Sequence, residues 1–234
     1  MLSRINAHLP TGANLYTRGI LRIYDFIAHT VNGNYLWKCP TKPVLIPFFH
    51  ANAGPRHMDV GVGTGYFPYN RHNQGNRWPQ QLTLVNINEN CLESASKRVG
   101  LPDRTNSIVA NVLGNSLTLP GVDHRQFDSI SLMHVLHFLP CSPTEKGRIF
   151  SNLRPYLSSQ GTLFGTTILG RGTGQHWLSR LYMELYNWAG VFRNKEDGKE
   201  DFLRALEKEF EEVGCRVVGC VLIFQARKPK AEKK

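Results

Sequence analysis

The sequence predicts an α/β protein with a largely parallel β-sheet that is covered by helices on both faces. Short apolar strands alternate with amphipathic segments along most of the chain. A glycine-rich turn, 61–65, follows the first clear strand and precedes a helix. The last predicted helix carries one apolar stripe opposite a charged face. This alternation of strand and helix indicates parallel strands joined by helical crossovers.

The elements can be placed in order from the periodicity of apolar residues. A helical segment is expected before the turn-rich residues 32–34, and a second short segment spans 44–50. Helices are expected at 89–99 and from Thr144, as N-cap, to about Leu157. Five strands are expected at 58–62, 82–87, 108–113, 129–133 and 163–169.

The C-terminal residues allow two topologies. The apolar stripe of the last helix runs from Phe202 to Val213, and Gly214 is expected to end this helix. Residues 216–224 are nearly all β-formers, interrupted by Gly219. They form either a tight antiparallel pair or one bent strand.

Composition and charge exclude several classes of protein. The 234 residues contain 28 Lys and Arg against 18 Asp and Glu, a net charge of +10. The last eight residues carry +4 of this charge, from five basic residues and Glu232. The remaining charge is scattered along the chain, a distribution that does not favour nucleic-acid binding. No membrane span and no secretory signal is recognisable, and five cysteines lack metal-ligand spacing. We therefore expect a cytoplasmic protein with reduced thiols and no metal.

The glycine turn has a spacing that discriminates between ligands. It reads Asp59-x-Gly61-x-Gly63-x-Gly65, so the third glycine comes two residues after the second. A dinucleotide fingerprint requires three, and a phosphate-binding Walker loop requires a Gly-Lys-Ser/Thr that is absent. The turn nevertheless gives a ligand close access to backbone N–H groups at a helix start.

These residues resemble the first motif of the class I S-adenosylmethionine-dependent methyltransferases. Segments 82–88, 108–112, 127–137 and 161–164 resemble the family's later motifs. Residues 24–25 and 34–37 are similar to the N-terminal lid of ubiquinone-type and related small-molecule methyltransferases. The resemblance implies a Rossmann-like, doubly wound, mostly parallel seven-stranded sheet, whose last strand pair could be shortened, with an N-terminal helical lid.

The resemblance also implies a domain plan. Without internal repeats or linkers, residues 1–234 are expected to form a single domain. Residues 1–53 would form the helical lid and 54–227 the core, with a lid insertion at about 170–194. Residues 228–234 would form a disordered basic tail.

S-adenosylmethionine is the implied cofactor, with S-adenosylhomocysteine as its product. Asp59 would receive the methionine ammonium, Asn86 the ribose hydroxyls and Asn111 the adenine amino group. The family usually has a carboxylate at the ribose position and often at the adenine position, so two asparagines predict weaker recognition. The complete set of expected cofactor residues is Asp59, Gly61, Gly63, Thr64, Gly65, Asn86, Ile87, Asn111, Val112 and Met133.

Candidate catalytic residues lie at the carboxyl end of the fourth strand, where open α/β sheets bind their ligands. His134 and then His137 are the candidate general bases, with a role in shaping the pocket as the alternative for each. Segment 170–194 is rich in aromatic residues, which favours a lid over a hydrophobic acceptor as much as core packing. The expected substrate residues are Tyr24, Tyr35, Trp37, His176, Tyr182 and Tyr186.

Three functions remain open from the sequence. The first is a methyltransferase acting on a hydroxyl or nitrogen of a hydrophobic small molecule, as in natural-product biosynthesis. The second is an enzyme of the same fold that binds the cofactor weakly and catalyses cyclisation or isomerisation. The third, nucleic-acid binding through the basic tail, is disfavoured. The protein is expected to be a monomer or homodimer.

Overall fold

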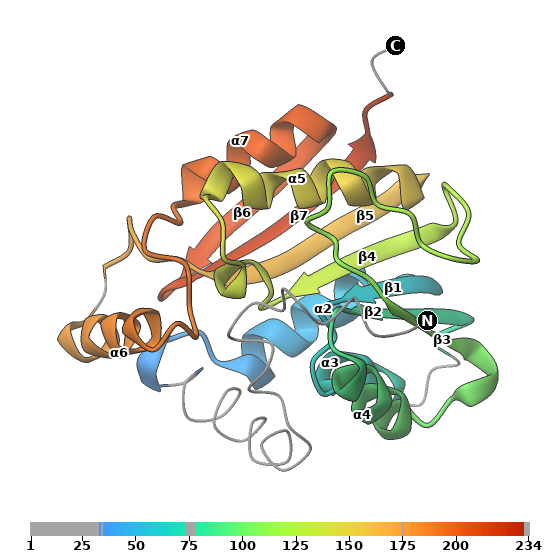
Figure 1. Ribbon diagram of the computed structural model, residues 1–234, viewed down its shortest axis with the longest axis horizontal. Coiled ribbons are helices and arrows are strands. Elements are labelled where there is room, and N and C mark those ends of the chain that lie inside the picture. Colours follow the sequence, from blue (N-terminus) through green and yellow to red (C-terminus); the bar gives the residue numbers. More distant parts are fainter. Residues whose placement is uncertain (1–32, 34, 74–77, 175, 232–234) are drawn as a thin grey trace, which may run out of the picture.

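The computed structural model describes residues 33, 35–73, 78–174 and 176–231. Within them one seven-stranded sheet has the order β3-β2-β1-β4-β5-β7-β6 (Figure 1). The first five strands of this order are parallel, and β7 is antiparallel to both β5 and β6. The strands are β1 (Arg56–Val60), β2 (Gln81–Asn86), β3 (Thr105–Val109), β4 (Phe127–Met133), β5 (Leu157–Ile168), β6 (Phe210–Val218) and β7 (Val221–Pro229).

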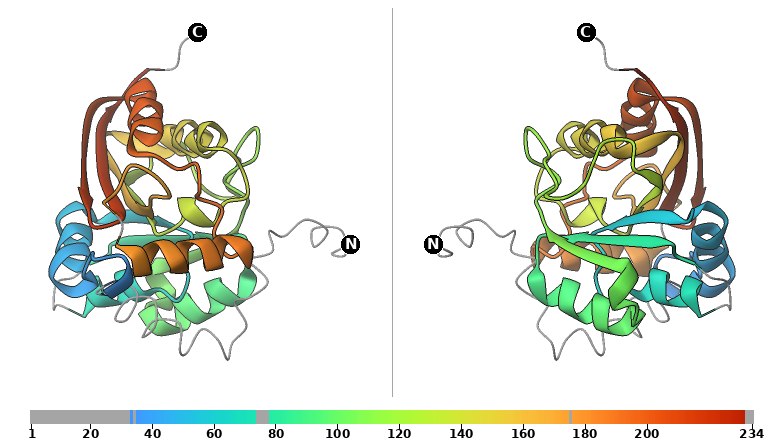
Figure 2. Two further views of the ribbon diagram at one scale, coloured as in Figure 1. Left: turned by 90° about the vertical axis from the view of Figure 1, so that its left-hand side faces the viewer. Right: turned by 90° about the vertical axis from the view of Figure 1, so that its right-hand side faces the viewer.

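Helices cover both faces of this sheet, which confirms the predicted doubly wound fold. Helices α5 and α7 lie on one face, and α2, α3 and α4 lie on the other (Figures 1 and 2). Each face has its own apolar core, because parallel strands between two helical layers are buried on both sides. The helices are α2 (Ile46–Asn52), α3 (Tyr66–His72), α4 (Glu89–Val99), α5 (Pro143–Leu153), α6 (Trp177–Trp188) and α7 (Lys199–Glu209).

Local capping explains where the crossover helices begin and end. Helix α4 matches its prediction: the Asn88 side chain accepts from Asn90 N–H, and Gly100 ends the helix in a left-handed conformation. Helix α5 begins at Ser142 rather than Thr144, because Ser142 and Glu145 form a reciprocal capping box with a proline between them. The predicted continuation to Leu157 is wrong, since Leu157 already begins β5.

Further boundaries differ from the prediction, and the largest shift is at β5, which begins at Leu157 instead of at residue 163. The third strand ends at Val109 instead of Leu113, because the Asn111 side chain accepts from Leu113 N–H and turns the chain. Helix α7 ends at Glu209, and Gly214 lies inside β6 instead of ending the helix. There the antiparallel ladder with β7, which starts with Phe210 opposite Pro229, overrides the helical pattern.

The C-terminal strands form the tight antiparallel pair, one of the two predicted alternatives. Gly219, with φ of 58°, lies in the turn between β6 and β7. Strand β7 continues to Pro229, so Lys228 and Pro229 belong to the sheet and not to a disordered tail. The predicted N-terminal lid helix falls largely on residues 1–32, outside the described residues. The part that is described contains a π-helical turn at Thr41–Leu45 and α2.

Candidate active site

The glycine turn leaves β1 and leads into α3 at the carboxyl edge of the sheet. Gly61, Gly63 and Gly65 all have positive φ, of 71°, 56° and 72°. A Cβ on Gly65 would lie 2.9 Å from the Ala95 Cα, so this glycine lets the turn pack directly on α4. No atom of the described residues lies within 4 Å of the place a Cβ would take on Gly63. Among the described residues, the middle of the turn is therefore left uncovered.

Asp59 lies at the base of this turn and is 3% exposed. Its carboxylate accepts a 2.5 Å hydrogen bond from the Ser131 hydroxyl. Burial raises the pKa of Asp59 to about 7, and the Ser131 hydrogen bond lowers it. Ser131 itself lies 3.0 Å from Nε2 of the buried His57. Asp59 was predicted from the sequence, whereas its partner Ser131 and the neighbouring His57 were not.

Two polar side chains mark the ends of the neighbouring strands. Asn86 ends β2, and its side-chain oxygen accepts from Asn88 N–H at 2.9 Å. Asn111 lies beyond the end of β3, is exposed, and holds the turn toward Leu113. The nearby Ile87 is half-buried, whereas the side chain of Val112 packs into the apolar core on the α5 side. The structure thus brings Asn86, Ile87 and Asn111 to the edge of the sheet where the glycine turn lies, whereas Val112 contributes to the core.

Helix α4 clamps the glycine turn through a residue that the sequence analysis missed. Arg98 donates to the Thr64 hydroxyl at 3.1 Å. Its guanidinium also lies over the rings of Tyr66 and Tyr69, 5.2 Å and 5.1 Å from their centroids. Thr64, predicted to touch the cofactor, is itself buried in this clamp.

The two candidate bases lie together just after β4. Met133, the last residue of β4, is buried. His134 is half-buried and has a left-handed backbone with φ of 58°, which is uncommon for a residue with a side chain. Its ring centroid lies 5.9 Å from that of His137. His134 therefore lies at the carboxyl end of β4 in a backbone conformation that the local fold imposes.

His137 is held much more tightly than His134. It is 1% exposed, its Nδ1 accepts from Ile168 N–H at 3.4 Å, and its carbonyl accepts from Arg193 N–H at 2.8 Å. Burial and the nearby charges of His134 and Lys146 hold the pKa of His137 well below its ordinary value. A neutral, weakly basic imidazole is a poor proton acceptor, so His134 is the better placed of the two candidates.

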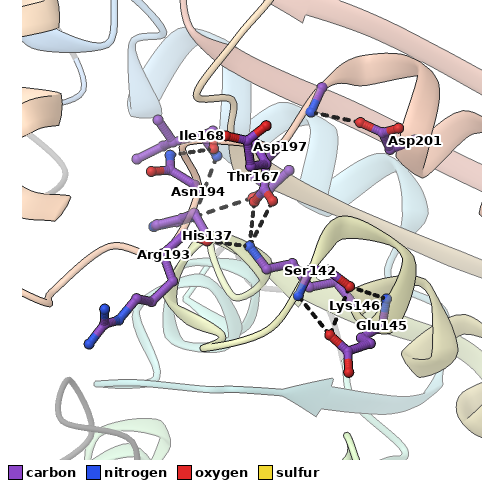
Figure 3. A network of polar contacts seen from close by, with 12 residues as sticks. His137, Ser142, Glu145, Lys146, Thr167, Ile168, Arg193, Asn194, Asp197 and Asp201 are labelled. Carbon is purple, nitrogen blue, oxygen red and sulfur yellow. Dashed lines mark hydrogen bonds and ion pairs between the residues drawn. The ribbon is translucent and has the colours of Figure 1, made fainter.

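A buried ion pair fixes the chain beside His137 (Figure 3). Lys146 on α5 contacts both carboxylate oxygens of Asp197, at 2.8 Å and 2.6 Å, and donates to the Arg193 carbonyl at 2.7 Å. Both side chains of the pair are at most 1% exposed. Asn194 adds a bond from its amide to the Ile168 carbonyl at 2.9 Å. This network anchors the end of the 170–194 segment to the sheet.

The predicted substrate residues divide into a buried and an exposed group. Trp37 and Tyr186 both contact Phe192, with centroids 5.7 Å and 4.8 Å apart, and Phe192 lies 4.7 Å from the His137 ring. We call Trp37, Phe138, Tyr186 and Phe192 the aromatic cluster. Phe138 and Phe192 had not been predicted for it.

The remaining predicted substrate residues lie outside the aromatic cluster. Tyr182 is partly exposed and lies 6.5 Å from Tyr186. Tyr35 is exposed, and His176 is an exposed N-cap of α6, which lies at the side of the sheet toward which β4 points (Figure 1). Tyr24 lies outside the described residues.

Two other features were sought in the described part of the chain. No group of three or more His, Cys, Asp or Glu residues there is arranged to hold a metal ion. None of its helices combines the length and apolar character needed to cross a bilayer.

An open glycine turn, a buried acid at its base and two polar strand ends define a ligand-binding α/β protein. In this class, ligands bind outside the carboxyl ends of the strands where the strand order reverses, here between β1 and β4. The order of the sheet therefore indicates the same edge as the glycine turn does, independently of any motif.

Comparison with known proteins assigns the family. Residues 58–165 match a family model described as a methyltransferase domain. The chain is 49% identical over 218 residues to methyltransferase ctvB of Aspergillus terreus, covering 93% of this chain and 94% of that protein. It is 37% identical to O-methyltransferase NEC2 of Pyricularia oryzae, over 90% of this chain and 89% of that protein.

A solved structure agrees at the level of the fold. N-methyltransferase NodS from Bradyrhizobium japonicum, in complex with S-adenosyl-L-homocysteine, matches with a TM-score of 0.55 and 15% identity. The match covers 80% of this chain and 85% of that one. The chain belongs to the class I S-adenosylmethionine-dependent methyltransferases.

Proposed function

We propose that this protein transfers the methyl group of S-adenosylmethionine to a hydroxyl oxygen of a hydrophobic small molecule in natural-product biosynthesis. The observation that carries the proposal is that Gly61 of the glycine turn packs against Val135, which directly follows His134, while the aromatic cluster contacts His137 two residues further on. The name of the O-methyltransferase relative supports oxygen as the acceptor atom. Another relative, 34% identical, is named for a physcion biosynthesis cluster, which supports the biosynthetic setting.

The residues at the turn fit this cofactor. Gly63 leaves room for the methionine and ribose portion, and Asp59 offers a carboxylate to the methionine ammonium. Asn86 offers an amide at the end of β2, where the family places a partner for the ribose hydroxyls. S-adenosylmethionine, when bound, supplies an electrophilic methyl group on a positively charged sulfur.

The chain's own contribution is alignment and proton acceptance. The aromatic cluster packs beside His137, and its half-buried members, Phe138 and Tyr186, are suited to the flat face of an aromatic acceptor. His134 would accept the proton of the acceptor hydroxyl as the oxygen forms its new bond to carbon. Holding both reactants in line contributes most of the acceleration that such a displacement needs.

Titration calorimetry with S-adenosylmethionine and S-adenosylhomocysteine tests the cofactor. Binding in the micromolar range is expected, followed by methyl transfer to members of a panel of phenols and enols. No binding up to millimolar concentration would contradict the proposal. Binding without transfer to any acceptor would favour the alternative of a non-methylating enzyme on the same fold.

His134→Asn is expected to lower kcat at least about 100-fold, because positioned general bases contribute that much or more. Asparagine tolerates the left-handed backbone, so the variant removes the imidazole without adding strain. Affinity for S-adenosylhomocysteine should stay within about twofold. The exposed His124, which packs on Tyr156, provides the matched control His124→Asn. An unchanged kcat in His134→Asn would mean that His134 is only a wall of the pocket.

Asn86→Asp is expected to tighten binding of S-adenosylhomocysteine at least about fivefold. One carboxylate oxygen can keep the bond from Asn88 N–H while the other accepts from a ribose hydroxyl, and a charge-assisted bond is about twice as strong. Calorimetry measures the change. Asn73→Asp adds the same charge at the exposed end of α3 and should leave affinity unchanged. Equal affinities for both variants would place the ribose elsewhere.

A further inference from the structure

A row of buried polar groups runs through the sheet behind the glycine turn. Strands β1 and β4 are parallel neighbours, with His57 opposite Ser129 and Asp59 opposite Ser131. The four side chains share one face of the sheet and are at most 3% exposed. His57 Nδ1 lies 2.7 Å from the Ser129 hydroxyl, and His57 Nε2 lies 3.0 Å from the Ser131 hydroxyl. We call His57, Ser129, Ser131 and Asp59 the Asp59 relay.

The contacts determine which way the protons point. Ser131 gives its single proton to Asp59, so its oxygen must accept from His57 Nε2–H. Nδ1 of the neutral ring then accepts from the Ser129 hydroxyl. Ser129 can donate because its oxygen accepts from Gly54 N–H at 2.8 Å. Every donor of the relay therefore has an acceptor when Asp59 is a carboxylate.

Protonation of Asp59 weakens this arrangement. If the new proton points to Ser131, the whole relay must reverse and the Ser129 proton loses its acceptor on His57. If the proton sits on the other carboxyl oxygen, Ser131 donates to a neutral group, and that bond is about half as strong. Both cases favour the ionised form of Asp59.

The surroundings of the relay are apolar and oppose ionisation. The rings of Phe49, Trp78 and Phe164 lie 5.3 Å, 5.7 Å and 5.9 Å from the His57 ring, centre to centre. Burial lowers the pKa of His57 to about 3, so the ring stays neutral near pH 7. The apolar surroundings favour the protonated form of Asp59. The hydrogen bonds of the Asp59 relay oppose this effect because they favour the carboxylate.

The elements around the relay carry few other ionisable groups that could shift the pKa of Asp59. Strand β2 presents none, and β4 carries Asp128 at its start, where it forms an ion pair with Arg56 of β1. Helix α2 carries His50. The shift in the pKa of Asp59 comes from burial and from Ser131, with no contribution from these groups.

We propose that His57, Ser129 and Ser131 are positioning residues that keep Asp59 ionised toward the methionine ammonium, so that cofactor binding is coupled to loss of a proton from Asp59. This inference rests on the proposed function. The protonated acid cannot form the charge-assisted bond to the ammonium. Affinity for S-adenosylhomocysteine should therefore be full above the pKa of Asp59 and fall as pH drops through about 7.

Calorimetry with S-adenosylhomocysteine between pH 5.5 and 8 tests the coupling in the full chain. In wild type, affinity should fall nearly tenfold per pH unit well below the midpoint, with a proton released on binding. Ser131→Ala removes the donor to Asp59 and should move the midpoint up by about one pH unit. His57→Leu should move it in the same direction by less, and His57→Gln, which keeps a donor toward Ser131, should restore it.

Thr83→Val is the matched control. Thr83 is fully buried on β2, its hydroxyl makes no hydrogen bond to the described residues, and it pairs with Met58 on the opposite face from Asp59. It should leave the midpoint unchanged. If His57→Leu does not fold, Ser131→Ala still tests the role of the relay, and the wild-type pH profile with proton release tests the coupling in either case.

The outcomes separate this inference from the proposed function. Wild type that does not bind S-adenosylhomocysteine at any pH contradicts the cofactor assignment. Wild type that binds with the same affinity across the pH range contradicts the coupling alone. An unchanged midpoint in both Ser131→Ala and His57→Leu would reduce the relay to a packing role.

Discussion

Replacing Lys146 with methionine is expected to lower the free energy of unfolding by about 3–5 kcal/mol. The Lys146 ammonium is fully buried and contacts both oxygens of Asp197 as well as the Arg193 carbonyl. Methionine fills a similar volume but leaves the Asp197 carboxylate in the interior without its counter-ion. Denaturant-induced unfolding measures the loss.

The control for this prediction is the double variant Lys146→Met/Asp197→Leu. Burial raises the pKa of Asp197 and lowers that of Lys146, which shows that removal from water destabilises the charged form of both groups. Replacing both by apolar residues removes that cost and should recover most of the lost stability. A single variant within 1 kcal/mol of wild type would show that Asp197 finds another partner.

Lys146→Met should also affect the acceptor side of the proposed site, near His137, more than the cofactor side at the glycine turn. The carbonyl of Asp197 accepts from Gly170 N–H at 3.1 Å, so the ion pair joins the beginning and the end of the 170–194 segment. Phe192 of that segment contacts His137, whereas the glycine turn packs on α4. Lys146→Met should therefore lower turnover of the acceptor and leave affinity for S-adenosylhomocysteine nearly unchanged.

The architecture could be predicted from the sequence because it depends on local patterns of apolar residues and glycines. Strand–helix alternation predicted the doubly wound sheet, and the glycine spacing placed the turn between β1 and α3. Boundaries failed where long-range pairing overrides local preference. Phe210 continues a helical stripe in sequence but lies in β6, because the ladder with β7 offers it a strand partner.

Side-chain partnerships across the fold were beyond prediction. Lys146 and Asp197 are 51 positions apart, and His57 and Ser129 are 72 apart. The alternating polar residues of β1 and β4 were the available signal for the relay, but alternation alone does not give the register between strands. Helix α6 has apolar residues on several faces, so the sequence does not show which face packs against the rest of the protein. The structure turns Met183 inward and leaves Trp177 and Trp188 exposed.

Gly63→Ala is expected to weaken binding of S-adenosylhomocysteine at least tenfold while costing only about 1–2 kcal/mol of stability. The cost is backbone strain, because alanine adopts a φ of 56° less readily than glycine. No clash within the described protein adds to it, since the new Cβ would point into open space. In the proposed complex that space belongs to the cofactor, so the methyl group would stand where the ligand approaches the backbone.

Gly100→Ala separates strain from obstruction. Gly100 has φ of 70°, its Cβ position is equally open, and it ends α4 outside the predicted cofactor residues. Both variants should lose similar stability in thermal unfolding, but only Gly63→Ala should lose affinity in calorimetry. Equal affinities would mean that the cofactor does not pass over the middle of the turn. If Gly63→Ala binds S-adenosylhomocysteine more weakly than Gly100→Ala does while the two variants are equally stable, the ligand lies against Gly63. Backbone strain is common to both substitutions, so only the proposed ligand at Gly63 distinguishes them.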